Sequence, residues 1–238
     1  AYIVLKTVNS ALLSGADLQF EVRRLPNPLG LATNVNVIAG NDINPATAVA
    51  DILLNEWGGV GIDPAWVDVA NFTAAAARFA TEGLGMSLAI AQENYGVALV
   101  NEMQEQTRSI VYADPETSLI RIKPLRPDAY DESTLLEITP SEASSYQSFA
   151  KTAFLAMPTH FAIKYYNRSR NYEQTVVTNR NPAVPPMTSR AKRLASIDFG
   201  AVCTDAIAEA SFDLLLSSIS APQISSTIVT CLLYTSDA

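Results

Sequence analysis

Residues 44–61 read N-P-A-T-A-V-A-D-I-L-L-N-E-W-G-G-V-G, and they contain the strongest structural signal in the chain. An asparagine side chain caps free helix N–H groups, and proline suits the first helical position, so Asn44-Pro45 predicts a helix start. Glycine accepts positive φ at little cost, so Gly58-Gly59 predicts the helix end. The apolar residues between these signals recur at helical spacing: Val49, Ile52, Leu53 and Trp57.

Further helices and strands are predicted on both sides of this segment. Residues 72–83 are rich in alanine and favour a second helix, 97–107 carry a more polar helical stripe, and 202–216 predict a last helix. Runs of alternating apolar and polar residues between turn signals indicate strands. These strands are predicted at residues 2–8, 18–25, 109–112, 119–123, 135–138, 161–167 and 172–177.

The order of these elements predicts an α+β fold, with mixed antiparallel sheets and several short helices. Helices and strands do not alternate in the regular manner of a parallel βαβ protein. We expect N-terminal strands of a partial domain at residues 1–43 and an α+β domain at 44–134. A second β-rich segment with a C-terminal helix is expected at 135–230.

Both ends of the sequence carry signals about its origin. Ala1 rather than Met stands first, which predicts that the natural beginning lies upstream. Residues 231–238 (C-L-L-Y-T-S-D-A) look like one reading frame of a sequencing adaptor, as expected for a metagenomic fragment that runs into library DNA. Without Cys231, only Cys203 remains, and one thiol makes neither an intrachain disulfide nor a zinc site.

Composition excludes several classes of function. The 238 residues are 48% hydrophobic, which is enough for a real core, and no apolar run approaches the roughly 18 residues of a membrane span. The net charge of −8 argues against general affinity for nucleic acid or anionic lipid. Residues 151–195 differ, because eight basic residues against one acidic residue give this segment +7 and leave −15 for the remainder.

The sequence does not predict a set of catalytic, cofactor-binding or metal-binding residues. His160 is the single histidine, so a zinc site of the usual type or a Ser-His-Asp arrangement has little to draw on. The glycines after Trp57 follow a helix and lack the Lys-Ser/Thr of a phosphate loop, which favours a turn. Two carboxylate pairs have a spacing that acid–base catalysis could use, although surface loops usually carry such residues: Asp63 with Asp68, and Asp128 with Asp131.

The basic segment contains the most informative charge pattern. Lys164, Tyr166, Arg168 and Arg170 share one face if the predicted strand stays regular that far. Such a row suits contact with passing DNA or with an acidic neighbouring subunit, so Lys164, Arg168 and Arg170 are candidate partner contacts. The alternative is a solvated sheet face, opposite a core face formed by Phe161, Ile163 and Tyr165.

Taken in order, five stretches resemble the phage tail-protein family that includes tip attachment (host-specificity) proteins and baseplate hubs. The resemblance covers most of residues 20–217, and each motif consists mainly of caps, turns and core positions. The fourth stretch departs from the family's Arg-x-Asp-Tyr element, because Ala129 precedes Tyr130. The stretches are F-E-V-R-R-L-P-N-P-L-G (20–30), N-P-A-T-A-V-A-D-I-L-L-N-E-W-G-G-V-G-I-D (44–63), F-T-A-A-A-A-R-F-A-T-E-G-L-G (72–85), Y-A-D-P-E-T-S-L-I-R-I-K-P-L-R-P-D-A-Y (112–130) and P-T-H-F-A-I-K-Y-Y-N-R-S-R-N-Y (158–172).

This resemblance implies a virion structural protein of a phage or prophage-derived tail, made in the bacterial cytoplasm. It implies a homotrimeric ring with hub-like tail domains, standing between the tail tube and the host-contacting tip. The implied partners are tube, distal tail and tip subunits, with transient passage of DNA through the lumen and without catalytic residues or cofactors in this region. An acidic lumen would repel the phosphate backbone, in keeping with the net charge.

Two other functions stay open at this stage. The chain could be the non-catalytic flank of a larger tail-associated cell-wall hydrolase, or a cell-surface adhesin unrelated to phage. Turnover of a cell-wall substrate would indicate an enzyme, and neighbouring reading frames would separate a tail protein from an adhesin.

Overall fold

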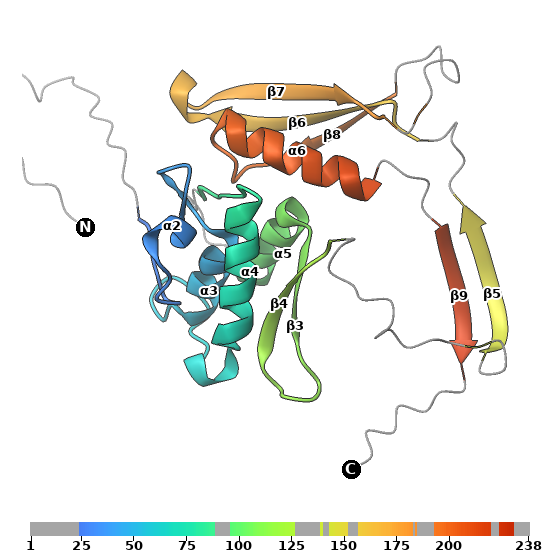
Figure 1. Ribbon diagram of the computed structural model, residues 1–238, viewed down its shortest axis with the longest axis horizontal. Coiled ribbons are helices and arrows are strands. Elements are labelled where there is room, and N and C mark those ends of the chain that lie inside the picture. Colours follow the sequence, from blue (N-terminus) through green and yellow to red (C-terminus); the bar gives the residue numbers. More distant parts are fainter. Residues whose placement is uncertain are drawn as a thin grey trace, which may run out of the picture.

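The computed structural model describes residues 24–88, 96–126, 139, 143–151, 157–182, 184, 193–219 and 224–230. Figure 1 shows three parts: a first body of helices and short sheets (24–126), a second body of a sheet and one helix (157–219), and a two-stranded ribbon. The mixture of helices and mainly antiparallel sheets confirms the predicted α+β class.

The first body places its helices around one hydrophobic core. Phe72 and Phe79 of helix α4 are fully buried there, with Met86, Met103 and Ile122 packed in the same cluster. Its helices are α2 (Thr33–Asn36), α3 (Pro45–Leu54), the 3-10 turn η1 (Pro64–Trp66), α4 (Val69–Thr81) and α5 (Gly96–Thr107), and its strands are β1 (Val37–Ile38), β2 (Asp42–Ile43), β3 (Ser109–Ala113) and β4 (Ile120–Pro124).

The helix start at Asn44-Pro45 is confirmed, and the asparagine does more than cap. Its side-chain oxygen accepts a hydrogen bond from Ala46 N at 3.0 Å. Its amide nitrogen donates to the carbonyls of Val35 at 2.9 Å and Ala76 at 2.8 Å. Because Asn44 is completely buried, this one side chain ties α2, α3 and α4 together.

The predicted end of this helix at Gly58-Gly59 is wrong, because α3 stops at Leu54. Asn55 leaves the helix with extended dihedral angles, and its side-chain oxygen accepts hydrogen bonds from Trp57 N and Gly58 N, which forms a turn instead. Trp57 is 98% exposed and does not belong to the buried stripe. Gly59 is nevertheless required, since an added Cβ would lie 2.2 Å from the carbonyl oxygen of Ile52.

The second helix and the hairpin follow the prediction closely. Helix α4 begins three residues before residue 72, because Asp68 caps it by accepting a hydrogen bond from Asn71 N. Strands β3 and β4 pair antiparallel, with Ser109 opposite Pro124 and Ala113 opposite Ile120. The isolated bridge between Ile43 and Met86 adds a backbone link beside the core.

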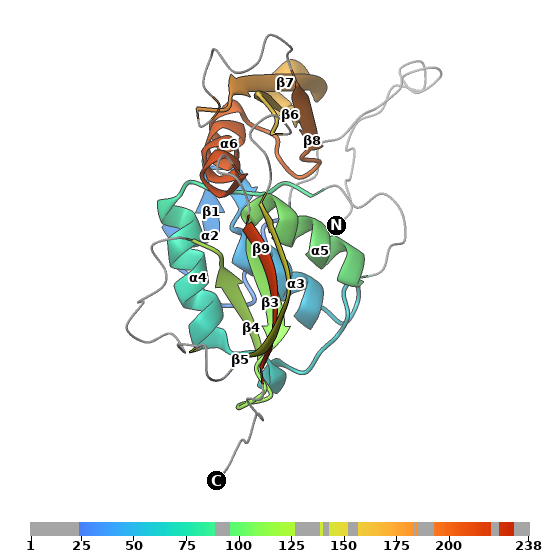
Figure 2. The same cartoon turned by 90° about the vertical axis from the view of Figure 1, so that its right-hand side faces the viewer.

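The second body is a three-stranded sheet with one helix on one face (Figures 1 and 2). Strand β6 pairs antiparallel with β7 and parallel with β8, so this sheet is mixed. The predicted last helix is present, shifted by three residues. The elements are β6 (His160–Asn167), the 3-10 turn η5 (Arg168–Arg170), β7 (Glu173–Arg180), β8 (Leu194–Asp198) and α6 (Asp205–Ile219).

Helix α6 lies between the sheet and the first body. Ile207, Phe212 and Leu215 pack with the sheet residues of the second core, whereas Ala210 and Leu214 pack against the first. Gly85 allows the close approach, since a Cβ there would lie 2.9 Å from Ile207. The first core also includes Leu29, so it continues across the expected domain boundary between residues 43 and 44.

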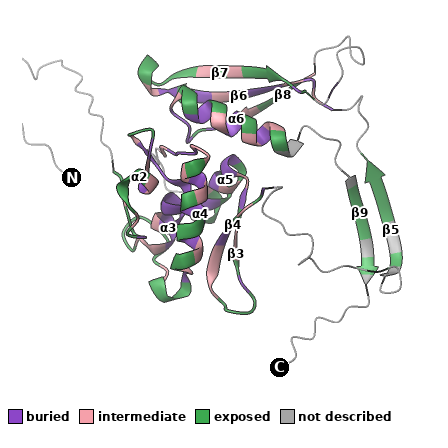
Figure 3. Cartoon of the chain, viewed as in Figure 1, coloured by how far each residue is buried: buried purple, intermediate pink, exposed green. Residues whose placement is uncertain are grey.

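The ribbon consists of β5 (Ala143–Lys151) and β9 (Ile224–Thr230), paired antiparallel. Its two strands lie on either side of the second body in sequence, and neither was predicted. The side chains described on it are all exposed (Figure 3). Phe149 is 73% exposed.

Several predicted features fall outside the described residues. They are the strands at 2–8 and 135–138, the first six residues of the strand at 18–25, and the carboxylates Asp128 and Asp131. In the part of the chain that is described, the helices are too short or too polar to cross a bilayer.

We expect Asn44→Ala to lower the free energy of unfolding by about 2–4 kcal/mol, because the helix loses its cap and two buried carbonyls lose their donor. The matched control is Asp63→Ala, which removes an exposed cap from η1 and should cost under about 1 kcal/mol. Urea denaturation followed by circular dichroism measures both values. Equal losses would show that the inter-helix bonds of Asn44 contribute nothing.

Candidate functional site

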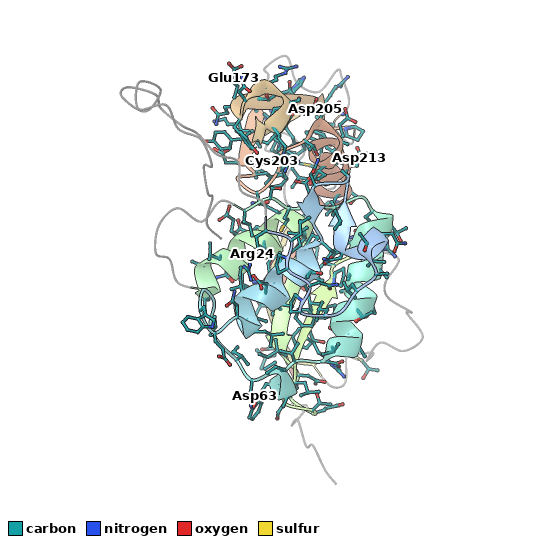
Figure 4. All side chains as sticks on the ribbon, turned by 90° about the vertical axis from the view of Figure 1, so that its left-hand side faces the viewer. Arg24, Asp63, Glu173, Cys203, Asp205 and Asp213 are labelled. Carbon is teal, nitrogen blue, oxygen red and sulfur yellow. The ribbon has the colours of Figure 1, made fainter. Side chains whose placement is uncertain are left out.

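A cavity of about 610 Å³ opens where the second body meets the first. Apolar side chains of α3 and its surroundings form part of the wall, and Tyr166 and Tyr172 of the second body form another part. Two arginines line it, and each is paired with an aspartate: Arg24 with Asp51, and Arg168 with Asp42. In Figure 4, Cys203 lies at this junction and Asp63 lies at the opposite end of the first body.

The pair between Arg168 and Asp42 is the most buried ion pair at the cavity. Arg168 Nη2 lies 2.8 Å from Asp42 Oδ1 and donates a second hydrogen bond to Ser87 Oγ at 2.6 Å. The Ser87 hydroxyl donates in turn to Asp42 Oδ1 at 2.5 Å. Asp42 is completely buried, and the side chain of Arg168 is only 14% exposed. This network therefore fastens the second body to β2 and to the segment after Met86.

Local structure places Arg168 at this point. Strand β6 ends at Asn167, whose side-chain oxygen caps η5 by accepting a hydrogen bond from Ser169 N. The amide nitrogen of Asn167 donates to Asp205 Oδ1 at 2.6 Å, next to the hydroxyl of Tyr165, which bonds the same oxygen. The backbone N–H of Arg168 donates to the carbonyl of Cys203. The turn is thereby fixed to the start of α6, and its first side chain points toward Asp42.

The electrostatics of the site favour charge pairing over nucleophilic chemistry. The hydrogen bond to Asp42 raises the pKa of the Arg168 guanidinium above its ordinary value, so this group stays charged. Burial raises the pKa of the Cys203 thiol and so favours its protonated form. The protonated thiol is unreactive, because the thiolate is the nucleophile. Burial and the bond to Asp205 raise the pKa of Tyr165 to about 12, so its hydroxyl stays protonated at neutral pH.

The three candidate partner contacts do not form one row. The core face of Phe161, Ile163 and Tyr165 is confirmed, but the strand is not regular beyond Asn167, so the predicted alternation ends there. Lys164 is half-buried on β6, and Arg170 is exposed on η5. The expectation that Arg168 contacts a partner is corrected, because its guanidinium binds Asp42 within the chain.

The remaining candidate residues serve local structure. His160 is half-buried, its Nδ1 lies 3.0 Å from Thr159 Oγ1, and it does not line the cavity. Asp63 caps η1, and Asp68 caps α4 and pairs with Arg121 at 2.8 Å. Within the described ranges, His, Cys, Asp and Glu side chains do not gather in threes that could hold a metal ion.

Sequence reasoning missed the partners of Arg168. Asp42 and Ser87 lie in short segments without a motif, and Arg168 is 126 residues away from Asp42 along the chain. A signal existed at Gly85, where an added Cβ would lie 2.9 Å from the Cβ of Asp42. A glycine outside a turn indicates a close approach, but it does not identify the approaching residue.

A second buried network joins the hairpin to α4. The guanidinium of Arg126 is 4% exposed, bonds both carboxylate oxygens of Glu82, and donates to the carbonyls of Thr107 and Arg108. Burial alone would raise the pKa of Glu82, but hydrogen bonds from Arg126 and Arg78 outweigh it and hold the pKa below its ordinary value. The carboxylate is therefore stabilised in its charged form.

We expect Arg168→Leu to lower the free energy of unfolding by about 3–5 kcal/mol, because it leaves Asp42 buried without its counter-charge. The matched control is Arg24→Leu at the same cavity. Arg24 is 64% exposed, so breaking its pair with Asp51 should cost under about 1 kcal/mol. Urea denaturation at neutral pH measures both, and similar losses would contradict the assignment of Arg168–Asp42 as the main link.

The lowered pKa of Glu82 predicts a pH dependence of stability. A depressed carboxyl pKa stabilises the folded state above the unfolded value of 4.5, and this contribution is lost as pH falls toward the folded pKa. We expect Glu82→Gln to be less stable than the parent chain at neutral pH, and the difference to shrink below the unfolded pKa. Thermal denaturation across this pH range measures the difference, and a gap that stays constant would contradict the prediction.

Comparison with known proteins adds no relative. Neither a scan of the chain against models of protein families nor a search of curated proteins returns a match.

Proposed function

We propose that this chain is a structural, non-catalytic subunit of a tailed-phage or prophage-derived tail. Its place is the tail tip or baseplate hub, as part of a homotrimeric ring between the tail tube and the host-contacting tip. The virion is its location, and other tail proteins are its partners.

The exposed ribbon is the observation that carries this proposal. A two-stranded ribbon by itself is marginally stable in water, and stable sheets need a third strand or a covered face. Strands β5 and β9 form their own sheet, in which every described side chain is exposed, among them Phe149 and Val229. A segment of this kind is expected in a protein whose neighbouring subunits complete it.

The resemblance to tail proteins supports the same proposal. The motifs that carry it fall on elements with structural duties: the Asn-Pro cap of α3, helix α4, the β3–β4 hairpin and strand β6. Asp63, Asp68 and Asn167, the most conspicuous polar residues near these motifs, cap helical turns. Side chains used in this way build a rigid subunit.

The charge of the chain suits a ring around DNA. With a net charge of −8, copies of this chain would present an acidic surface to a lumen, and acidic walls repel the phosphate backbone and let it pass. Exposed cations such as Arg170 on η5 remain suited to pairing with acidic neighbours at the outside of a ring.

Fractionated particles of a phage that encodes this chain test this function. Particles are separated into heads and tails, and peptides of this chain are identified by mass spectrometry. We expect the peptides in the tail fraction, together with tube and tip proteins. Recovery only with heads, or only with cell envelopes, would overturn the proposal and favour an adhesin in the latter case.

A cell-wall assay is the control for an enzymatic role. The purified chain is incubated with peptidoglycan, and released sugars and peptides are measured beside a known hydrolase. A structural subunit should release neither, whereas turnover would show that the chain itself carries hydrolase activity.

A further inference from the structure

Among the residues that the structure describes, two long strand edges are open and match each other in length. Strand β9 has seven residues and ends the β5–β9 ribbon, and β7 has eight residues and ends the sheet of order β7-β6-β8. We propose that the β9 edge of one copy pairs with the β7 edge of a second copy, which joins ribbon and sheet into one intermolecular sheet. This inference rests on the proposed function for its ring, and it names the surface through which the ring forms.

Within the ribbon, β9 is the edge fit for pairing. Strand β5 has two register shifts, at Ala143/Ser145 and Tyr146/Ser148, while β9 runs through the same pairs without an extra residue. Bulges twist an edge away and protect it from further pairing. The ribbon therefore carries one protected edge on β5 and one regular, unprotected edge on β9.

Within the second body, β7 is the corresponding edge. It pairs with β6 residue by residue from His160↔Arg180 to Asn167↔Glu173, without a shift. Its residues are exposed or half-buried throughout, with Val176 at 50% exposure in the middle of the strand. Strand β8 at the other edge has only five residues, so it offers a β9 strand fewer hydrogen bonds.

Charge permits a second copy of this chain as the occupant at these two edges. The chain carries −8, so two copies repel each other on average. Strand β9 (I-S-S-T-I-V-T) has no charged residue, and β7 (E-Q-T-V-V-T-N-R) has one charge of each sign, at its two ends. Natural edge strands usually carry charges, especially lysine, that prevent this kind of pairing. The two edges can therefore meet without like charges facing each other.

Within one chain the β9 and β7 edges lie apart, so the proposed pairing is between copies. Both Figures 1 and 2 show the ribbon away from β7, which lies on the far side of the second body from α6. Pairing β9 with β7 uses a different surface on each partner, and such head-to-tail contacts form a ring when the rotation between copies closes and an open filament when it does not. A symmetric β9–β9 contact would instead stop at a dimer and leave every β7 edge open.

Cysteine cross-linking of the full chain tests this interface. The background is C203A/C231A, and one preparation carries Ser226→Cys on β9 while a second, of different tag length, carries Val176→Cys on β7. The two are mixed and treated with a short bis-maleimide. We expect a cross-linked heterodimer from the mixture. The matched control replaces Val176→Cys by Leu194→Cys on β8, where the side chain is similarly exposed (54%), and should give little product.

A charge on the edge provides the second measurement. Val176→Lys should shift the oligomer to monomer in analytical ultracentrifugation and leave the circular dichroism spectrum unchanged, because edge lysines oppose strand addition. Failure to cross-link, a product with Ser226→Cys alone, or an oligomer unaffected by Val176→Lys would each overturn the interface. If the chain is found in tail fractions but does not cross-link, the proposed function stands and this interface is wrong. If the chain cross-links but is missing from tail fractions, the interface stands and the proposed function is wrong.

Discussion

The ion pair between Arg168 and Asp42 joins two bodies that have separate hydrophobic cores. Taking both charges out of water is costly, and the pair repays that cost only with good geometry and satisfied hydrogen bonds. Ser87 supplies part of this by bonding both partners, and the backbone N–H of Arg168 is held by Cys203. Such a pair contributes little net stability when intact, but any other placement of the second body would leave a buried charge unpaired. It therefore specifies one arrangement of α6 and its sheet on the first body.

Local chemistry made part of this fold predictable. The start of α3, the presence of α4 and the β3–β4 hairpin depend on caps, turns and periodicity within a few residues, and all three are confirmed. The predicted end of α3 is wrong because Asn55 redirects the chain by accepting a hydrogen bond from the N–H of Trp57, and helical spacing alone cannot exclude that. Strands β5 and β9 were not predicted, for a different reason. Ser148 pairs with Thr227, 79 residues later, and nothing in either short stretch identifies its partner.

The site was less predictable than the fold. Arg168 pairs with an acidic group, as its charge suggests, but the sequence pattern assigned it to an external partner. Burial decided otherwise: Asp42 is inaccessible to water, so its counter-ion has to come from within the chain. Arg170 differs from Arg168 only in what surrounds it, which is information that residue type and spacing do not contain.

The position of the ribbon has a consequence for how this protein can change. Lys151 and Ile224 face each other across the ribbon, so the chain leaves the ribbon and returns to it at neighbouring points. Segments with adjacent ends can be replaced as modules, because the rest of the fold only has to connect to two neighbouring points. Related proteins could thus exchange this whole insertion and keep the strands that frame it. A replacement would need a cation positioned for Asp42 and apolar side chains that cover the first core, as Ala210 and Leu214 do here.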